Sequence, residues 1–334
     1  MIYNNIIMSY ALLIGLNYTY TPNRLYGCIN DCIRMRDVLL TKYGFTESNI
    51  VFMRDDIYNS SHPLYPNKAN MMLQIRNLFA ISKTTANLLY FHYSGHGSSI
   101  KDRNSDEKDG ADEFIVPSDY FVNGSKIIDD ELLALTLNLN PSVPCFMIFD
   151  SCHSGTILDL NWCYTYNNST GLFIQSPGTN ISSNAQNSII CISGCNDNEV
   201  SLDVLYKGQY NGALSNGLYN VLSQLSAGQL ISVGTIVTNI YKYLIINSFK
   251  QNPIISTQLP VNINGVAFLK AASLVAPAPA PAPSQTPSQS SVPNLSISIE
   301  QQALINQINN LVVNNIMTGS QITALVAATL LTLQ

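Results

Sequence analysis

A histidine and a cysteine each follow an apolar segment and stand among small residues. His96 lies between Gly95 and Gly97, and Cys152 lies in the segment Ser151–Gly155. A cysteine attacks as the thiolate, but its usual pKa of about 8.5 leaves it mostly protonated near neutral pH. A histidine within reach can take that proton and then donate it to the leaving amine. The pair therefore predicts a cysteine hydrolase, with Cys152 as the nucleophile and His96 as the base.

Two other histidines stand near these residues and are weaker candidates for the base. His92 lies inside the apolar segment, and His153 is adjacent to the nucleophile. A free cysteine alone is commonly just a small buried residue. Two glycine-containing segments, each after an apolar run, favour catalysis instead. The backbone N–H groups of Gly97 and Cys152 are the expected donors to an oxyanion.

The apolar segments that precede these residues predict buried parallel strands. Residues 10–16, 88–93 and 143–149 are continuous apolar runs, which are typical of strands covered on both faces. Because open α/β sheets carry their sites beyond the carboxyl ends of strands, we expect His96 and Cys152 at one sheet edge. Further strands are expected at 50–53 and 189–193, and helices at about 31–42, 67–82, 212–224 and 233–249. Strands that alternate with helices predict an α/β protein with a mostly parallel sheet.

Composition excludes several classes of protein. The 334 residues are 46% hydrophobic and 11% charged, and the net charge is -5, so nothing suggests a nucleic-acid partner. The seven cysteines are not spaced like a disulfide framework. No apolar run reaches the roughly 18 residues that span a bilayer, and the N-terminus lacks the basic region of a signal peptide. We therefore expect a cytoplasmic protein.

The C-terminal part of the chain differs in composition from the rest. The globular domain is expected to cover residues 1–270, and residues 271–295, rich in Pro, Ala and Ser, are expected to form an extended linker. Residues 296–334 predict a short helical tail with Glu300 as its one charged residue. Such a tail should self-associate, bind a partner or fold back on the domain.

Several segments together resemble the type I metacaspases, relatives of the caspases. The resemblance covers about Ser9 to Leu269 and implies the caspase fold, a mostly parallel six-stranded sheet between helices. It also implies a large-subunit region at about 1–160 and a small-subunit region at about 188–270, which are joined by a loop at 161–187. The segments that carry it are Gly27–Asp31, Tyr93–Gly97, Asp109–Glu113 with Pro117 and Asp119, Asp150–Gly155, Ile192–Cys195 and Gly212–Ser215.

The resemblance implies cleavage after Arg or Lys, which needs a negatively charged S1 pocket. The matching positions are Asp31 and Asp150. Asp150 directly follows the strand that leads to Cys152, so a role in S1 is geometrically sensible. For Asp31 the residues alone leave a second explanation open, a charge favoured by the dipole at a helix N-terminus.

The resemblance also implies activation by Ca²⁺, and the positions that match its ligands are Asp112, Asp129, Asp130 and Asp159. Calcium prefers six to eight oxygen ligands, often carboxylates. The alternative is a solvated acidic loop, with Asp129 serving as a helix cap.

Two other functions stay open at this stage. One is a catalytically silent caspase-like scaffold or regulatory protein that acts through its C-terminal tail. The other is a protease of the same architecture with a different preference, an Asp-specific caspase or an Asn-specific legumain-like enzyme. No Lys or Arg occurs between Lys126 and Lys207, so an enzyme that cuts after basic residues could not cleave itself between the two regions.

Overall fold

The computed structural model describes residues 8–101, 110–178, 187–194, 203–206 and 209–270. By its contacts the chain divides into two units, Met1–Ala276 and Pro277–Gln334, and every element described below lies in the first. The expected linker and tail, and with them the tail's expected partner, lie outside the described residues.

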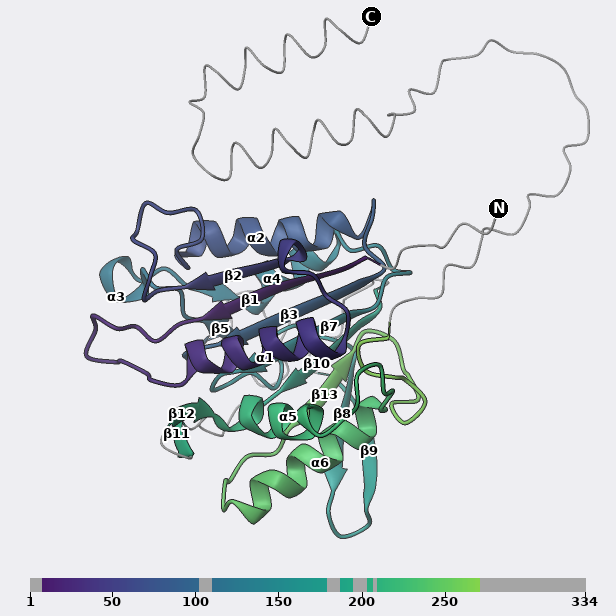
Figure 1. Ribbon diagram of the computed structural model, residues 1–334. Coiled ribbons are helices and arrows are strands. Elements are labelled where there is room, and N and C mark those ends of the chain that lie inside the picture. The colour runs from purple at the N-terminus through teal and green to yellow at the C-terminus, as the bar shows by residue number, and fades with distance from the viewer. Residues whose placement is uncertain (1–7, 102–109, 179–186, 195–202, 207–208, 271–334) are drawn as a thin grey trace, which may run out of the picture. The chain divides into compact units, whose positions relative to one another are not determined.

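A central eight-stranded sheet organises the first unit, with the strand order β2-β1-β3-β7-β10-β13-β8-β9 (Figure 1). The first five strands in this order are parallel, and β13, β8 and β9 each run antiparallel to the strand before them. Their bounds are β1 (Ser9–Gly15), β2 (Ile50–Arg54), β3 (Leu88–Ser94), β7 (Cys145–Asp150), β8 (Trp162–Asn167), β9 (Leu172–Pro177), β10 (Ile189–Ser193) and β13 (Ile254–Thr257).

The expectation of a six-stranded sheet was wrong in its strand number. Six strands from β2 to β13 form a mostly parallel sheet, and the hairpin β8–β9 adds two more beyond β13. This hairpin lies in the segment 161–187, which was expected to be a loop. Its residues are mostly exposed or half-buried, so they show neither a continuous apolar run nor the alternation that predicts a strand.

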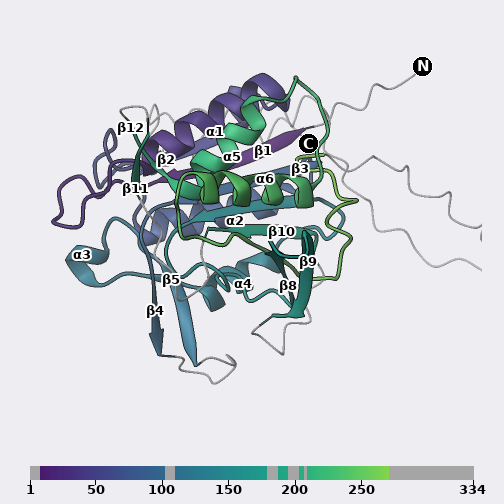
Figure 2. The ribbon, with the colours of Figure 1, turned by 90° about the horizontal axis from the view of Figure 1, so that it is seen from below.

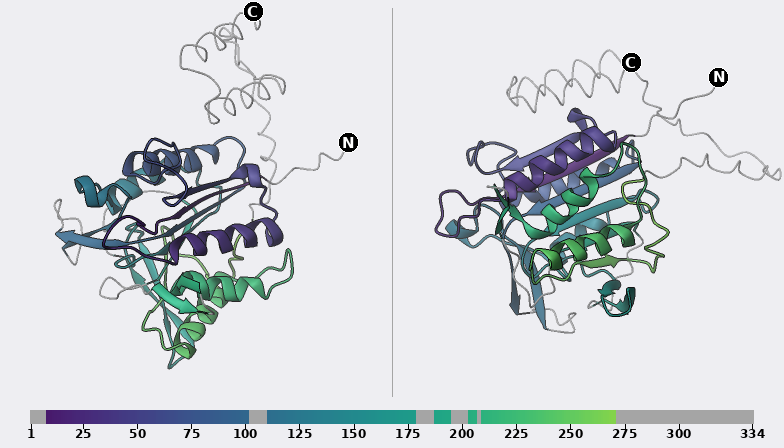
Figure 3. Two further views of the ribbon diagram at one scale, coloured as in Figure 1. Left: turned by 60° about the vertical axis from the view of Figure 1, so that its left-hand side comes forward. Right: turned by 60° about the horizontal axis from the view of Figure 1, so that its bottom comes forward.

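Helices cover both faces of the sheet, which confirms the expected α/β class (Figure 3). One core lies under α2 (Lys68–Ile81) and α4 (Asp129–Thr136), and the other under α1 (Cys28–Lys42), α5 (Ala213–Ser223) and α6 (Val233–Ile246). Alternate residues of β3 reach the two cores, with Phe91 in the first and Tyr90 in the second. Burial on both faces explains why the central strands are apolar throughout.

Three smaller features complete the described part of the unit. The strands β4 (Gly97–Lys101), β5 (Ala111–Ile115) and β6 (Ile127–Ile128) form a small antiparallel sheet, and Figure 2 shows β4 and β5 side by side beyond the main sheet. The strands β11 (Asp203–Tyr206) and β12 (Gln209–Gly212) form a hairpin, and short helices occur at Tyr120–Asn123 (α3) and Glu47–Asn49. Within the described ranges, every helix is too short or too polar to cross a bilayer.

Candidate active site

The strands that lead to His96 and Cys152 are direct neighbours in the sheet. The strands β3 and β7 pair in parallel, with Ser94 opposite Asp150. His96 is two residues beyond Ser94, and Cys152 is two residues beyond Asp150, so the same edge of the sheet carries both. The backbone N–H of Gly95 donates to the carbonyl oxygen of Asp150 at 3.3 Å, which ties the two turns together.

The turn after β3 rests directly on the turn after β7. A Cβ at Gly97 would lie 2.1 Å from the carbonyl oxygen of Cys152, so only glycine allows this backbone contact. Cys152 forms no disulfide and is partly exposed, and the next residue, His153, adopts the left-handed conformation with φ of 49°. The structure therefore brings together the three residues expected to carry the chemistry, His96, Cys152 and Gly97.

One hydrogen bond defines which nitrogen of His96 carries the proton. The Nε2 atom lies 2.7 Å from the carbonyl oxygen of Asn23, in the loop between β1 and α1. A carbonyl oxygen can only accept, so Nε2 is the protonated nitrogen and donates this bond. In the neutral ring, Nδ1 is then the unprotonated nitrogen that can accept a proton.

His92 has a different environment, which agrees with rejecting it as the base. It is fully buried, and burial lowers its pKa to about 3 because the charged form loses its hydration. Its Nδ1 lies 3.0 Å from the hydroxyl of Tyr90, and its Nε2 lies 3.0 Å from the hydroxyl of Ser215. His92 is thus a neutral member of a buried hydrogen-bond network.

The two carboxylates expected in S1 converge from different elements. Asp31, in the first turn of α1, accepts the backbone N–H of Gly212 at 2.9 Å and the hydroxyl of Ser94 at 2.8 Å. Asp150, at the end of β7, accepts the backbone N–H of Ser215 at 2.8 Å. This N–H belongs to the first turn of α5, where the helix dipole favours a negative charge.

Gly212 separates the two carboxylates and has no room for a side chain. A Cβ there would lie 2.2 Å from Oδ2 of Asp150 and 3.0 Å from Oδ2 of Asp31. The exposed fractions of Asp31 and Asp150 are 2% and 3%. Two buried carboxyl groups therefore lie at the sheet edge that carries Cys152, each held by backbone or hydroxyl donors.

A second group of carboxylates contains three of the four positions expected to hold a metal. One oxygen each from Asp129, Asp130 and Asp159 lies within 4.8 Å of the others, and Asp129 and Asp159 are 1% exposed. Asp129 begins α4 and accepts a short hydrogen bond from the backbone N–H of Glu113. Asp159, which has φ of 46°, lies seven residues after Cys152 in sequence, in the segment that follows the cysteine turn.

Asp112, the fourth expected position, is not a member of this group in the structure. Side chains alternate along β5, and the neighbour Glu113 is the one that contacts the segment after Cys152, by accepting from the hydroxyl of Thr156. Asp112 lines a hollow of about 320 Å³ together with Lys68, Lys126 and Glu131.

Sequence reasoning missed two tyrosines that surround His96. The ring of Tyr18 lies 4.7 Å from the His96 ring between centroids, and the hydroxyl of Tyr93 donates to the carbonyl oxygen of His96 at 2.7 Å. Tyr93 stands in the segment that was singled out, but nothing in the sequence assigned it a role. Tyr18 gave no signal, because it lies 78 positions from His96 in sequence.

The sequence of this chain matches one family model and resembles several known proteins. A family model described as metacaspase, peptidase C14 domain, matches residues 10–161, the segment that contains both His96 and Cys152. Metacaspase-1 of Schizosaccharomyces pombe is 32% identical over 301 residues, which cover 76% of this chain and 68% of that protein. Metacaspase-1 of Kluyveromyces lactis is 34% identical over 258 residues, which cover 64% of this chain and 58% of the relative.

A further relative and one solved structure extend this comparison. Metacaspase-1B of Aspergillus niger is 43% identical over 156 residues, which cover 46% of this chain and 35% of that protein. The chain therefore spans between about a third and about two thirds of the length of these relatives. A crystal structure of a Geobacter sulfurreducens protein matches with a TM-score of 0.51 at 22% identity, over 76% of this chain and 95% of that one. At this identity the match is evidence for the fold alone.

Proposed function

Since this chain belongs to the metacaspase family of cysteine-type peptidases and has the type I pattern, we propose that it is an endopeptidase that cleaves after Arg or Lys. One observation carries the proposal. The parallel pairing of Ser94 with Asp150 and the contact of Gly97 with Cys152 bring a histidine turn and a cysteine turn together at one sheet edge. A buried pair of carboxylates lies at the same edge.

The proposed reaction begins with a proton transfer inside the dyad. Nδ1 of His96 takes the thiol proton of Cys152. Nε2 keeps its own proton and donates it in a hydrogen bond to the carbonyl oxygen of Asn23. The thiolate sulfur attacks the carbonyl carbon of the scissile bond, and the backbone N–H groups of Gly97 and Cys152 donate to the oxyanion.

The intermediate then collapses in two steps. The carbon–nitrogen bond breaks, Nδ1 of His96 gives its proton to the leaving amine, and a thioester to Cys152 remains. A water molecule, deprotonated by His96, attacks this thioester and releases the new carboxyl group together with the regenerated thiol.

We further propose that Asp31 and Asp150 select a basic side chain at the substrate position before the scissile bond. A carboxylate has about four acceptor positions, so a guanidinium or ammonium group can bind beside the backbone donors of both aspartates. Because both carboxylates are almost fully buried, a cation next to them is attracted more strongly than it would be at an exposed site.

Calcium is the proposed cofactor, and its site would be the carboxylate group Asp129, Asp130 and Asp159. The donors are hard oxygens, and oxygens bound to one Ca²⁺ at about 2.4 Å lie at most about 5 Å apart, which fits the 4.8 Å spread of this group. Bound there, the ion would neutralise these carboxylates and fix the segment after Cys152 against the start of α4.

A panel of fluorogenic peptides tests the activity and its preference together. Peptides with Arg, Lys, Asp or Asn before the scissile bond are incubated with protein in millimolar Ca²⁺ and in chelator. We expect cleavage after Arg and Lys in Ca²⁺, and loss of this activity in Cys152→Ala and His96→Ala. The matched controls are Cys163→Ala, which removes another partly exposed cysteine, and His62→Ala, which removes a histidine outside the two turns that carry His96 and Cys152.

The same panel separates specificity from chemistry. Asp31→Asn should raise the KM for Arg peptides, whereas Asp37→Asn changes an exposed carboxylate of the same helix and should leave the KM unchanged. Cleavage after Asp or Asn would overturn the basic preference but not the dyad. Silence on every peptide would favour the non-enzymatic scaffold instead.

A further inference from the structure

Tyr18 has an unusual backbone conformation, and its ring contacts the ring of His96. It follows β1, has φ of 50° and is 2% exposed, although a left-handed conformation is uncommon for a bulky side chain. Its ring centroid lies 4.7 Å from that of His96, and the two ring planes are tilted by 31°. Such a strained position persists only when its surroundings hold it, and it often serves a site.

The hydroxyl of Tyr18 joins the backbone of His96 to that of Val116, the residue after β5. The N–H of His96 donates to this hydroxyl at 2.9 Å, and the hydroxyl donates to the carbonyl oxygen of Val116 at 2.7 Å. The hydroxyl of Tyr93, 3.1 Å away from that of Tyr18, donates to the carbonyl oxygen of His96. Both backbone polar groups of His96 therefore bond to tyrosine hydroxyls.

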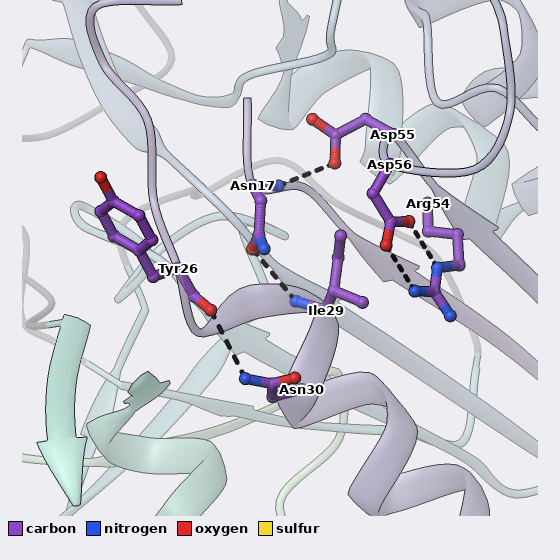
Figure 4. Close-up of polar contacts among 7 residues, drawn as sticks. All are labelled: Asn17, Tyr26, Ile29, Asn30, Arg54, Asp55 and Asp56. Atoms are coloured by element: carbon purple, nitrogen blue, oxygen red, sulfur yellow. Dashed lines mark hydrogen bonds and ion pairs between the residues drawn. The ribbon is translucent and has the colours of Figure 1, made fainter. Parts of the chain in front are cut away.

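Asp55 holds the segment that carries Tyr18. It follows β2, is 7% exposed, and accepts the N–H of Asn17 at 2.9 Å and that of Thr19 at 3.3 Å (Figure 4 shows the first of these bonds). The backbone N–H of Tyr18 also bonds to it. Successive N–H groups around a left-handed residue form a concavity that binds an anion, and here the anion is the Asp55 carboxylate.

The same segment anchors the loop that contains Asn23. The carbonyl oxygen of Asn17 accepts the N–H of Leu25 at 2.8 Å. The side-chain oxygen of Asn17 accepts the N–H of Ile29 at 3.3 Å, and Figure 4 shows this second bond. Asn23 lies between Asn17 and Leu25 in sequence, and its carbonyl oxygen accepts the hydrogen bond from Nε2 of His96. The orientation of that carbonyl thus depends on Asn17, and through it on Asp55.

We propose that Asp55 and Tyr18 are positioning residues for His96. Asp55 fixes the backbone of residues 17–19, and this segment presents the Tyr18 hydroxyl and the Asn23 carbonyl that hold the imidazole in place with Nε2 protonated and Nδ1 toward the nucleophile. The proposal rests on the proposed function in one respect, the role of His96 as base.

The charge of Asp55 suits this role better than a neutral side chain would. The preceding residue, Arg54, pairs with Asp56 at 2.5 Å, so this basic side chain is bound to another carboxylate. Burial raises the pKa of Asp55, and the backbone donors oppose that shift. An amide at this position would turn an N–H donor toward a cluster of N–H donors, whereas a carboxylate only accepts.

Two variants with matched controls test the proposal. Asp55→Asn is compared with Asp56→Asn, which breaks the neighbouring ion pair, and Tyr18→Phe is compared with Tyr20→Phe, which changes an exposed tyrosine of the same loop. Because a misplacement of about 1 Å can cost on the order of 100-fold in rate, we expect Asp55→Asn to lower kcat by about 10- to 100-fold with KM unchanged. The two controls should keep the original kcat.

Nitrogen chemical shifts of the His96 ring give a readout that needs no activity. The protein is labelled with ¹⁵N-histidine in the Cys152→Ala background, and the His96 signals among the four histidines are assigned with His96→Gln. We expect one protonated and one unprotonated nitrogen in the parent, and shifts that move toward each other in Asp55→Asn and Tyr18→Phe as the ring exchanges tautomers.

The outcomes separate this proposal from the proposed function. Unchanged shifts and unchanged kcat in both folded variants would overturn the positioning role. Changed shifts in a protein that cleaves no peptide would support the positioning role and overturn the endopeptidase. If Asp55→Asn does not fold, Tyr18→Phe, which keeps the ring and removes only the hydroxyl, decides the question with the same two measurements.

Discussion

Gly97 lies against the carbonyl oxygen of Cys152, so close that a Cβ at position 97 would be 2.1 Å from that oxygen. The contact is made by backbone atoms on both sides, so it fixes the separation of the two turns whatever side chains surround them. The residue before Gly97 is the proposed base, and Cys152 is the proposed nucleophile. The relative position of the two residues therefore depends on the absence of a side chain at Gly97.

Replacement of Gly97 should separate the two residues of the dyad. In Gly97→Ala the backbone of one turn must move by more than 1 Å, and we expect kcat/KM on Arg peptides to fall by about 100-fold or more. Kinetics and the thermal unfolding midpoint are measured together. Gly265→Ala is the control, because the new Cβ would meet its closest neighbour, the Asn262 side chain, at 3.2 Å. Wild-type kinetics in Gly97→Ala would contradict the close contact.

The sequence predicted the strand ends well because burial determines their composition. The strands β3 and β7 are covered on both faces, so they are continuous apolar runs, and the residues after them had to lie at the carboxyl edge. Local patterns could not predict that Asp31 and Asp150 lie close together, because Gly212, which lies between them, comes from a distant part of the chain. That prediction depended on the resemblance to a family.

Other features could not be predicted from local patterns. The hairpin β8–β9 lies at the sheet edge and is largely exposed, so its side chains follow no apolar alternation. The hydrogen bonds of Asp55 to residues 17–19 involve backbone N–H groups and the positive φ of Tyr18. Neither can be read from the residue types in the sequence. The grouping of Asp129, Asp130 and Asp159 without Asp112 depends on how α4, β5 and the segment after Cys152 meet in space, and β5 turns Glu113 rather than Asp112 toward that segment.

Gly212→Ala should damage substrate recognition without damage to the nucleophile. The new Cβ would lie 2.2 Å from Oδ2 of Asp150, so the carboxylates proposed for S1 must shift. We expect a raised KM for Arg and Lys peptides. The rate at which iodoacetamide alkylates Cys152, followed by peptide mass spectrometry, should stay unchanged because the new Cβ meets side-chain atoms of Asp150 and Asp31 and not the turns that carry His96 and Cys152. A large drop in alkylation would contradict this separation.

The burial of His92 predicts a loss of stability in mild acid. Its pKa is about 3 in the folded protein and 6.5 in an unfolded chain, so below pH 6.5 the unfolded state binds the proton first. The free energy of unfolding should therefore fall by about 1.4 kcal/mol for each pH unit between about 6.5 and 3 from this group. Urea unfolding at pH 7.0, 6.0 and 5.0 measures the slope.

The histidine responsible can be identified by substitution. His92→Gln should flatten the dependence on pH between 6.5 and 5, whereas His62→Gln, which changes a less buried histidine, should leave the slope as it is. Equal slopes in the parent and in His92→Gln would assign the acid sensitivity to other groups.

Calcium should stabilise the protein if the carboxylate group binds it. Thermal unfolding of Cys152→Ala, which cannot digest itself, is followed in Ca²⁺ and in chelator. At 100 times the dissociation constant a ligand adds about 2.7 kcal/mol, so the midpoint should rise clearly. Asp159→Asn should abolish the rise, and Asp37→Asn should not. Asp112→Asn should reduce it less than Asp159→Asn, because the structure leaves Asp112 outside the group.

A basic preference predicts that the chain stays intact between its two halves. No Lys or Arg occurs from residue 127 to 206, a stretch that includes the hairpin β8–β9 and the strand β10. Because β8 pairs with β13 and β10 pairs with β7, the two halves form one continuous sheet without a cut. Active protein kept in Ca²⁺ should therefore show no new terminus within 127–206 by intact mass. A terminus there would mean either a different preference or cleavage by another enzyme, and its absence in Cys152→Ala would assign the cut to this protein itself.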